Sequence, residues 1–150
     1  MIRETAESFL QDVSTSDAVR KAMATEAGYD PELWHRICTE LCFQSMTVPE
    51  AYGGMGLGYV ELAAVLEQMG RVLLCSPFFS TVCLGVNALL VAGSQEQQAA
   101  FLPAIAEGSL TATLAYTGKQ AAHGGGSWGA EAIQATYRQS GNGYVLDGTL

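Results

Sequence analysis

Three side chains that can bind a metal ion lie close together in the first third of the chain. His35, Cys38 and Cys42 are spaced at i, i+3 and i+7, so a helix would place them on one face. Imidazole nitrogen and thiolate sulfur are the ligands that zinc prefers. However, no fourth ligand is evident, and small thiols beside Trp34 and Leu41 are also typical of a helical core. The sequence therefore favours buried thiols over a metal site.

A glycine-rich stretch contains the pattern of a hydrolase nucleophile. Residues 125–129 read G-G-S-W-G, which fits G-x-S-x-G, and His123 precedes three glycines as in the oxyanion loop of lipases. A nucleophile elbow needs a strand before the serine, a helix after it and a histidine further downstream. Both histidines of the chain lie upstream of Ser127. The pattern therefore favours a glycine-rich loop over a hydrolase site.

Helices are predicted for most of the first 108 residues. Apolar residues recur at intervals of three and four over 2–13, 31–42, 60–70 and 78–92, which predicts four helices. Asp30 is a typical N-cap for the second of them, and Ser94 with Gln97 has the spacing of a capping box that opens a fifth. We expect Pro103 to interrupt that fifth helix.

The remaining segments read as loops and strands. Residues 47–58 hold four glycines and a proline, so they form a loop, and no strand precedes them as a dinucleotide fingerprint would require. Alternation over 109–117 predicts a strand, and 133–138 with 144–146 predicts a hairpin around S-G-N-G. We therefore expect a mainly α fold with two domains: a helical domain, 1–108, and an incomplete antiparallel β segment, 109–150.

Composition narrows the function classes. The 150 residues are 49% hydrophobic and 15% charged, which suffices for one ordinary core. The net charge of −8 offers no basic face to neutralise phosphates, so we expect no nucleic-acid partner. Four cysteines without a dense framework indicate free thiols in a reducing compartment, the cytoplasm.

One uncharged run allows two interpretations. Between Arg71 and Glu96 there is no charged side chain, and residues 72–92 could span a bilayer. Pro77 would break such a helix near its start, and the flanks carry neither a basic cluster nor an aromatic belt. We therefore expect no membrane span, but a helix buried on all sides in a soluble protein.

Four segments occur in the order found in one known family. They are V-P-E-A-Y-G-G-M-G-L at 48–57, V-E-L-A-A-V-L-E-Q-M-G-R at 60–71, G-S-Q-E-Q-Q-A-A-F-L-P-A-I-A-E-G at 93–108 and Y-V-L-D-G at 144–148. Together they resemble the N-terminal domain and the start of the middle β-domain of the flavin-dependent acyl-CoA dehydrogenases. The resemblance covers nearly the whole chain.

This resemblance implies an oxidoreductase of fatty acid and lipid metabolism that contains FAD. In the family, a Glu of the C-terminal domain removes the α-proton of an acyl-CoA thioester while the β-hydride passes to the flavin. That base would follow Leu150, so we expect no catalytic residue within this chain, no activity of the isolated chain and no retention of FAD by it. The implied partners are the acyl-CoA substrate, an electron-transfer acceptor and other subunits of a homo- or hetero-oligomer.

The resemblance also implies site residues. The segment whose backbone and threonine hydroxyl approach the flavin matches Leu114, Ala115, Tyr116 and Thr117, although Thr117 could equally be an ordinary strand-end threonine. Ser127 is a displaced counterpart of a flavin-proximal serine. The helix that lines the acyl pocket matches Phe79, Ser80, Cys83 and Leu84, and these four could equally be core residues.

Departures from the family pattern leave alternatives open. The family usually continues with Glu-Pro and later Gly-Ser-Asp, whereas this chain reads Gly118-Lys119 and Gly126-Ser127-Trp128. The first alternative is a non-catalytic subunit of a heteromeric acyl-CoA dehydrogenase. The second is a helical interaction module without a cofactor.

Overall fold

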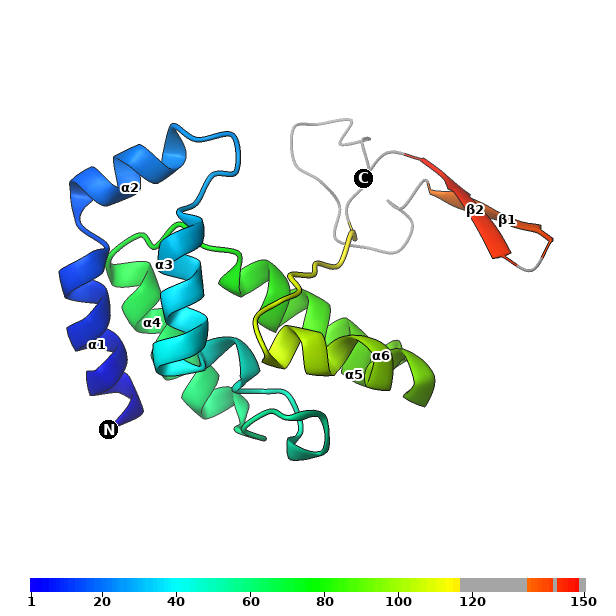
Figure 1. Cartoon of the computed structure of the whole chain (residues 1–150), viewed down its shortest axis with the longest axis horizontal. Helices are drawn as coiled ribbons and strands as arrows, with labels where there is room; N and C mark the ends of the chain where they lie inside the picture. The colour runs from blue at the N-terminus through cyan, green and yellow to red at the C-terminus, as the bar shows by residue number, and fades with distance from the viewer. Residues whose placement is uncertain (117–134, 142, 149–150) are drawn as a thin grey trace. The chain divides into compact units, whose positions relative to one another are not determined.

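The computed structural model describes residues 1–116, 135–141 and 143–148. The chain divides into two compact units, Met1–Thr113 and Leu114–Leu150. The first unit is helical (Figure 1). Its α-helices are α1 (Ile2–Val13), α2 (Ser16–Met23), α3 (Pro31–Arg36), α4 (Tyr59–Arg71), α5 (Asn87–Ala92) and α6 (Gln95–Ala106). Its other helical segments are η1 (Ile37–Leu41), η2 (Phe43–Ser45), η3 (Glu50–Tyr52) and η4 (Phe79–Val86).

The first part of the helical unit is built around α1, α3 and α4. In Figure 1 α1 lies along α4, and the continuous helix α3–η1 packs beside them. Their buried faces meet in one cluster whose members include Ala6, Leu10, Trp34, Ile37 and Val65. The predicted stripes of the first three helices thus form a single core.

Local signals place the helix starts. Asp30 Oδ1 accepts hydrogen bonds from the Glu32 and Leu33 amides at 2.9 and 3.4 Å, so the predicted N-cap of α3 is confirmed. Ser94 and Gln97 form the predicted capping box of α6. Helix α2 was not predicted, because it is only 8 residues long and buries a single side chain, Ala22.

A second core lies between α6, the continuous helix η4–α5 and the loop that follows η2. Val48, Val86, Leu102, Ile105 and Ala106 form its buried cluster. The loop keeps its shape through backbone hydrogen bonds, including those from the amides of residues 55, 56 and 57 to the carbonyls of residues 45, 48 and 46. The loop predicted over 47–58 is confirmed, apart from the short helical turn η3.

Two predictions about regular structure are wrong. Helix α6 runs through Pro103, since burial of Leu102 and Ile105 in the second core offsets the hydrogen bond that the proline cannot make. Residues 109–116 form no strand with other described residues. Their alternation instead reflects one-sided packing, in which Leu110 and Ala112 contact the second core.

The uncharged run is also less buried than predicted. Residues 72–76 are not helical, and Phe79 and Val91 are 56% and 85% exposed, so the helix is not buried on all sides. Only the buried side of η4 and its neighbours belongs to the two cores. Among the described residues, no helix is both long enough and apolar enough to cross a bilayer.

The described part of the second unit is an antiparallel hairpin of β1 (Thr136–Ser140) and β2 (Gly143–Asp147). Thr136 pairs with Asp147, and Tyr137 packs edge-on against Tyr144 with ring centroids 6.0 Å apart. The predicted hairpin and the mainly α fold class are therefore confirmed.

Candidate functional site

The continuous helix 79–92 carries the side chains predicted to line an acyl pocket. Its first turn begins at Ser76 and Pro77, where Ser76 Oγ accepts from the Phe78 amide at 3.4 Å and the Pro77 carbonyl accepts from the Thr81 amide at 2.9 Å. The residues predicted from the resemblance share one stripe of this helix, which we call the open stripe: Phe79, Ser80, Cys83 and Leu84. Phe79 is exposed and the other three are half-buried, and Cys83 also packs against the first core, so the stripe is partly accessible.

Two polar residues extend the open stripe, and the sequence did not point to them. Asn87 lies one turn beyond Cys83, whose carbonyl accepts from Asn87 Nδ2 at 2.8 Å. The Tyr59 hydroxyl donates to Asn87 Oδ1 at 2.9 Å and so ties α4 to this helix. The spacing of 83 and 87 was a usable signal for Asn87, whereas nothing in the sequence joins Tyr59 to it.

The open stripe is electrically neutral. Burial raises the pKa of the Cys83 thiol above its ordinary value, so the thiol keeps its proton at neutral pH and is a poor nucleophile. The Ser80 hydroxyl donates to the Pro77 carbonyl at 2.9 Å, which satisfies it locally. The stripe is therefore suited to contact with an apolar group and not to covalent chemistry.

A different side of the same helix holds the chain that leaves α6. The Ala112 amide donates to Thr81 Oγ1 at 3.2 Å, and Thr81 is fully buried. A Cβ atom on Gly85 would lie 2.7 Å from Ala112 Cβ and 3.1 Å from its carbonyl carbon. The chain thus passes directly over Gly85, beside an apolar hollow of about 510 Å³ that helix 79–92, α6 and residues 110–113 enclose.

The segment predicted to contact the flavin, residues 114–117, which we call the flavin segment, follows the point at which the chain passes over Gly85. Leu114 and Ala115 are exposed and Tyr116 is half-buried. The peptide groups of Leu114 and Ala115 make no hydrogen bond to another described residue. Thr117 and Ser127 lie outside the described residues.

Comparison with known proteins identifies the family. The model of the acyl-CoA dehydrogenase N-terminal domain matches residues 1–109. The chain belongs to the acyl-CoA dehydrogenase family. The resemblance to this family that the sequence showed is thereby confirmed, and the helical unit is of the acyl-CoA dehydrogenase N-terminal type.

Relatives of this acyl-CoA dehydrogenase chain agree in sequence and in fold. Acyl-CoA dehydrogenase IpdE2 of Mycolicibacterium smegmatis is 34% identical over 116 residues, which are 77% of this chain and 36% of that protein. A solved variant of the Tcur3481-Tcur3483 steroid ACAD matches with a TM-score of 0.82 at 27% identity, over 98% of this chain and 38% of that one.

The ChsE4-ChsE5 complex from Mycobacterium tuberculosis gives a TM-score of 0.79 at 28% identity, over 98% of this chain and 37% of that one. The chain therefore spans little more than a third of the length of each of these three proteins.

The three residues considered as metal ligands do not come together in this acyl-CoA dehydrogenase domain. His35 and Cys42 are exposed, whereas Cys38 is buried. The Cys38 thiol packs against Gly108, since a Cβ atom added to that glycine would lie 2.9 Å from the sulfur. In the part of the chain that the structure describes, no group of three or more His, Cys, Asp or Glu side chains converges as metal ligands would.

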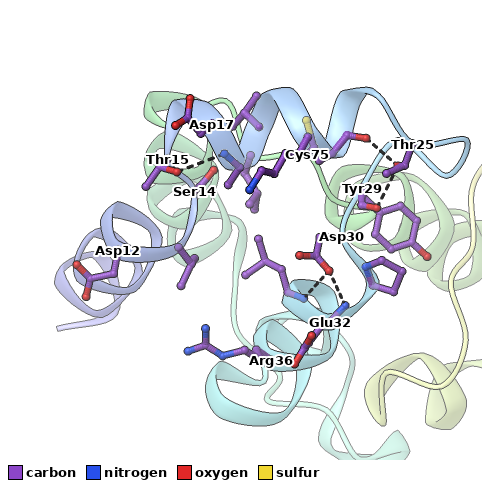
Figure 2. Close-up of a pocket in the computed structure, with 18 residues that line it drawn as sticks. Asp12, Ser14, Thr15, Asp17, Thr25, Tyr29, Asp30, Glu32, Arg36 and Cys75 are labelled. Atoms are coloured by element: carbon purple, nitrogen blue, oxygen red, sulfur yellow. Dashed lines mark hydrogen bonds between the residues drawn. The ribbon is translucent and has the colours of Figure 1, made fainter.

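A second hollow, of about 630 Å³, lies among α1, α2 and the start of α3 (Figure 2). Some of its polar groups stabilise helix starts, as Figure 2 shows for Asp30 at the first turn of α3 and for Thr15 at that of α2. Arg36 forms an ion pair with Glu40 at 2.7 Å and lies over the Phe9 ring.

Proposed function

We propose that this chain is the N-terminal part of an FAD-dependent acyl-CoA dehydrogenase that introduces an α,β double bond into an acyl-CoA thioester. The domain boundaries remain those expected from the sequence, a helical domain at 1–108 and the start of a middle β-domain at 109–150. The observation that carries the proposal is the family match over 1–109, which spans the elements bearing the open stripe.

The open stripe is proposed to contact the acyl tail. Phe79, Cys83 and Leu84 present apolar surface, and no charged side chain occurs anywhere on helix 79–92. Burying apolar tail surface against them would contribute about 25 cal/mol per Å². Ser80, whose hydroxyl is satisfied by Pro77, adds no unpaired donor that would oppose such a tail.

Leu114, Ala115, Tyr116, Thr117 and Ser127 are proposed to contact FAD. Leu114 and Ala115 are exposed, which supports access of a flat ring system to this segment. When bound, FAD would supply the acceptor for the β-hydride. The electron-transfer acceptor, the cytoplasmic location and the subunits of an oligomer belong to the same proposal.

Spectroscopy of the whole protein tests this function. The complete reading frame is expressed, and the purified protein is mixed anaerobically with straight-chain and with steroid side-chain acyl-CoA thioesters. We expect bound flavin at about one per chain and bleaching of its visible absorption by one class of thioester. Protein that binds FAD and is bleached by no acyl-CoA, under any pairing of subunits, would refute the proposed reaction.

A non-catalytic subunit of a heteromeric dehydrogenase is the second candidate. Gly118-Lys119 and Gly126-Ser127-Trp128 depart from the family's Glu-Pro and Gly-Ser-Asp. Two structural neighbours are named as pairs of different chains, ChsE4-ChsE5 and Tcur3481-Tcur3483, which supports hetero-oligomers among similar proteins. Flavin that is retained only after co-expression with a second acyl-CoA dehydrogenase chain would favour this candidate. Absence of flavin under both conditions would favour the helical interaction module.

A further inference from the structure

We infer that Thr81 and Gly85 are positioning residues for the flavin segment. They hold the chain at Ala112, immediately before Leu114, on a side of helix 79–92 different from the open stripe. One helix would then both line the acyl tail and fix the start of the cofactor-contacting segment. This inference rests on the proposed function.

The Thr81 hydroxyl supplies a specific anchor. Thr81 is fully buried, and its Oγ1 accepts the Ala112 amide at 3.2 Å across 31 positions of sequence. It is the one hydrogen bond that ties residues 111–113 to other described residues. The bond is partly buried, so the Ala112 amide would lose the net stabilisation of one hydrogen bond with its acceptor, and the anchor resists displacement.

Gly85 makes this anchor possible by leaving room for it. An alanine side chain there would meet Ala112 at its Cβ, at its carbonyl carbon at 3.1 Å and at its carbonyl oxygen at 3.3 Å. Two of these three atoms belong to the backbone, which cannot turn away as a side chain can. Any side chain larger than hydrogen at position 85 therefore pushes the chain off the helix.

The anchor lies close to the residues that it would position. Each residue extends the chain by at most about 3.6 Å, so Leu114 begins within about 7 Å of Ala112. Little slack remains to absorb a shift of Ala112 before the flavin segment starts. Loss of either contact should therefore be seen first in flavin binding and not in the stability of the helical cores.

The test uses the full-length protein and its FAD affinity. Apoprotein is titrated with FAD, and flavin fluorescence gives Kd for the wild type, Thr81→Val, Thr81→Ser and Gly85→Ala. Thr81→Val keeps the shape but removes the acceptor, so we expect a rise in Kd of about five-fold, the usual net value of one hydrogen bond. Thr81→Ser should restore Kd to within about two-fold of the wild type. Thr39→Val, which removes an exposed hydroxyl bonded to the His35 carbonyl, is the matched control.

Hydrogen exchange provides a readout independent of FAD. In the apoprotein, a peptide covering Ala112 should exchange about five-fold faster in Thr81→Val, and Thr81→Ser should not show this change. Unchanged Kd and unchanged exchange in Thr81→Val would overturn the inference while leaving the proposed function in place. If Thr81→Val does not fold, Gly85→Ala decides by the same two measurements. Wild-type protein that binds no FAD under any condition would overturn both the proposed function and this inference.

Discussion

Replacement of Gly54 by alanine is the sharpest test of the loop that supports the second core. A Cβ atom at this position would overlap the carbonyl group of Val48 and lie 2.5 Å from the Val48 Cβ. Val48 is fully buried, so neither its side chain nor its backbone can move outward without opening the second core. The loop must instead shift, and this places its hydrogen bonds at risk.

The size of the effect follows from those bonds. The amides of Met55, Gly56 and Leu57 donate to loop carbonyls at 3.0, 2.9 and 2.7 Å. At about 1 kcal/mol each, their loss alone lowers the free energy of unfolding by about 3 kcal/mol. Urea denaturation followed by far-ultraviolet circular dichroism should show this as a midpoint lowered by about 1 to 3 M, given ordinary m values.

Two further glycines provide matched controls for Gly54→Ala. Gly53 has open space around it but a φ of +82°, so Gly53→Ala should cost only the backbone strain of about 1 to 2 kcal/mol. Gly70 lies within α4 with open space and no positive φ, so Gly70→Ala should raise stability by about 0.5 to 1 kcal/mol. A Gly54→Ala protein as stable as Gly53→Ala would refute the steric argument.

Three other expectations concern stability. Leu102→Ala, in the second core, should lower the free energy of unfolding by about 2 to 5 kcal/mol. Val91→Ala, on the exposed side of α5, should change it by less than about 0.5 kcal/mol, and thermal denaturation of the two variants checks this difference. Asp30→Ala should cost about 1 kcal/mol through loss of the α3 cap and Asp30→Asn much less, again by thermal denaturation. Burial raises the pKa of the Cys38 thiol from 9.0 to about 11. The unfolded chain therefore loses this proton at lower pH than the folded one, so stability should be level below about pH 8 and fall by about 1 to 3 kcal/mol as pH rises from about 9 to about 11. Urea titrations of wild type and Cys38→Ala would contradict this if both showed the same fall.

Signals that act within a few residues were readable from the sequence. The caps at Asp30 and Ser94 follow from side-chain chemistry over two or three positions, and the structure confirms both. Pro103 is a local signal as well, but its prediction failed because tertiary packing of Leu102 and Ile105 outweighs one missing hydrogen bond. Helix α2 is amphipathic but only 8 residues long, so its pattern is too short to identify a helix from the sequence.

In the candidate site, too, the sequence predicted local relations and missed long-range contacts. Helical spacing alone puts Phe79, Ser80 and Cys83 on one stripe, as the structure does. By contrast, the contact of Tyr59 with Asn87 spans 28 positions and that of Thr81 with Ala112 spans 31. Contacts at such separations depend on how whole helices pack, so no local pattern in one sequence identifies them.

The uncharged run shows why hydropathy alone was ambiguous. Helix 79–92 contributes to three environments: Val82 to the first core, Val86 to the second, and Phe79 to the open stripe. A charge on either core-facing side would be buried without a partner, and a charge on the open stripe would oppose the apolar contact proposed for it. Charge is therefore excluded from each side of the helix for a different reason. The resulting uncharged sequence resembles a membrane span, although the helix is only partly buried. The exposure of Phe79 therefore supports the proposal that the open stripe contacts an apolar group.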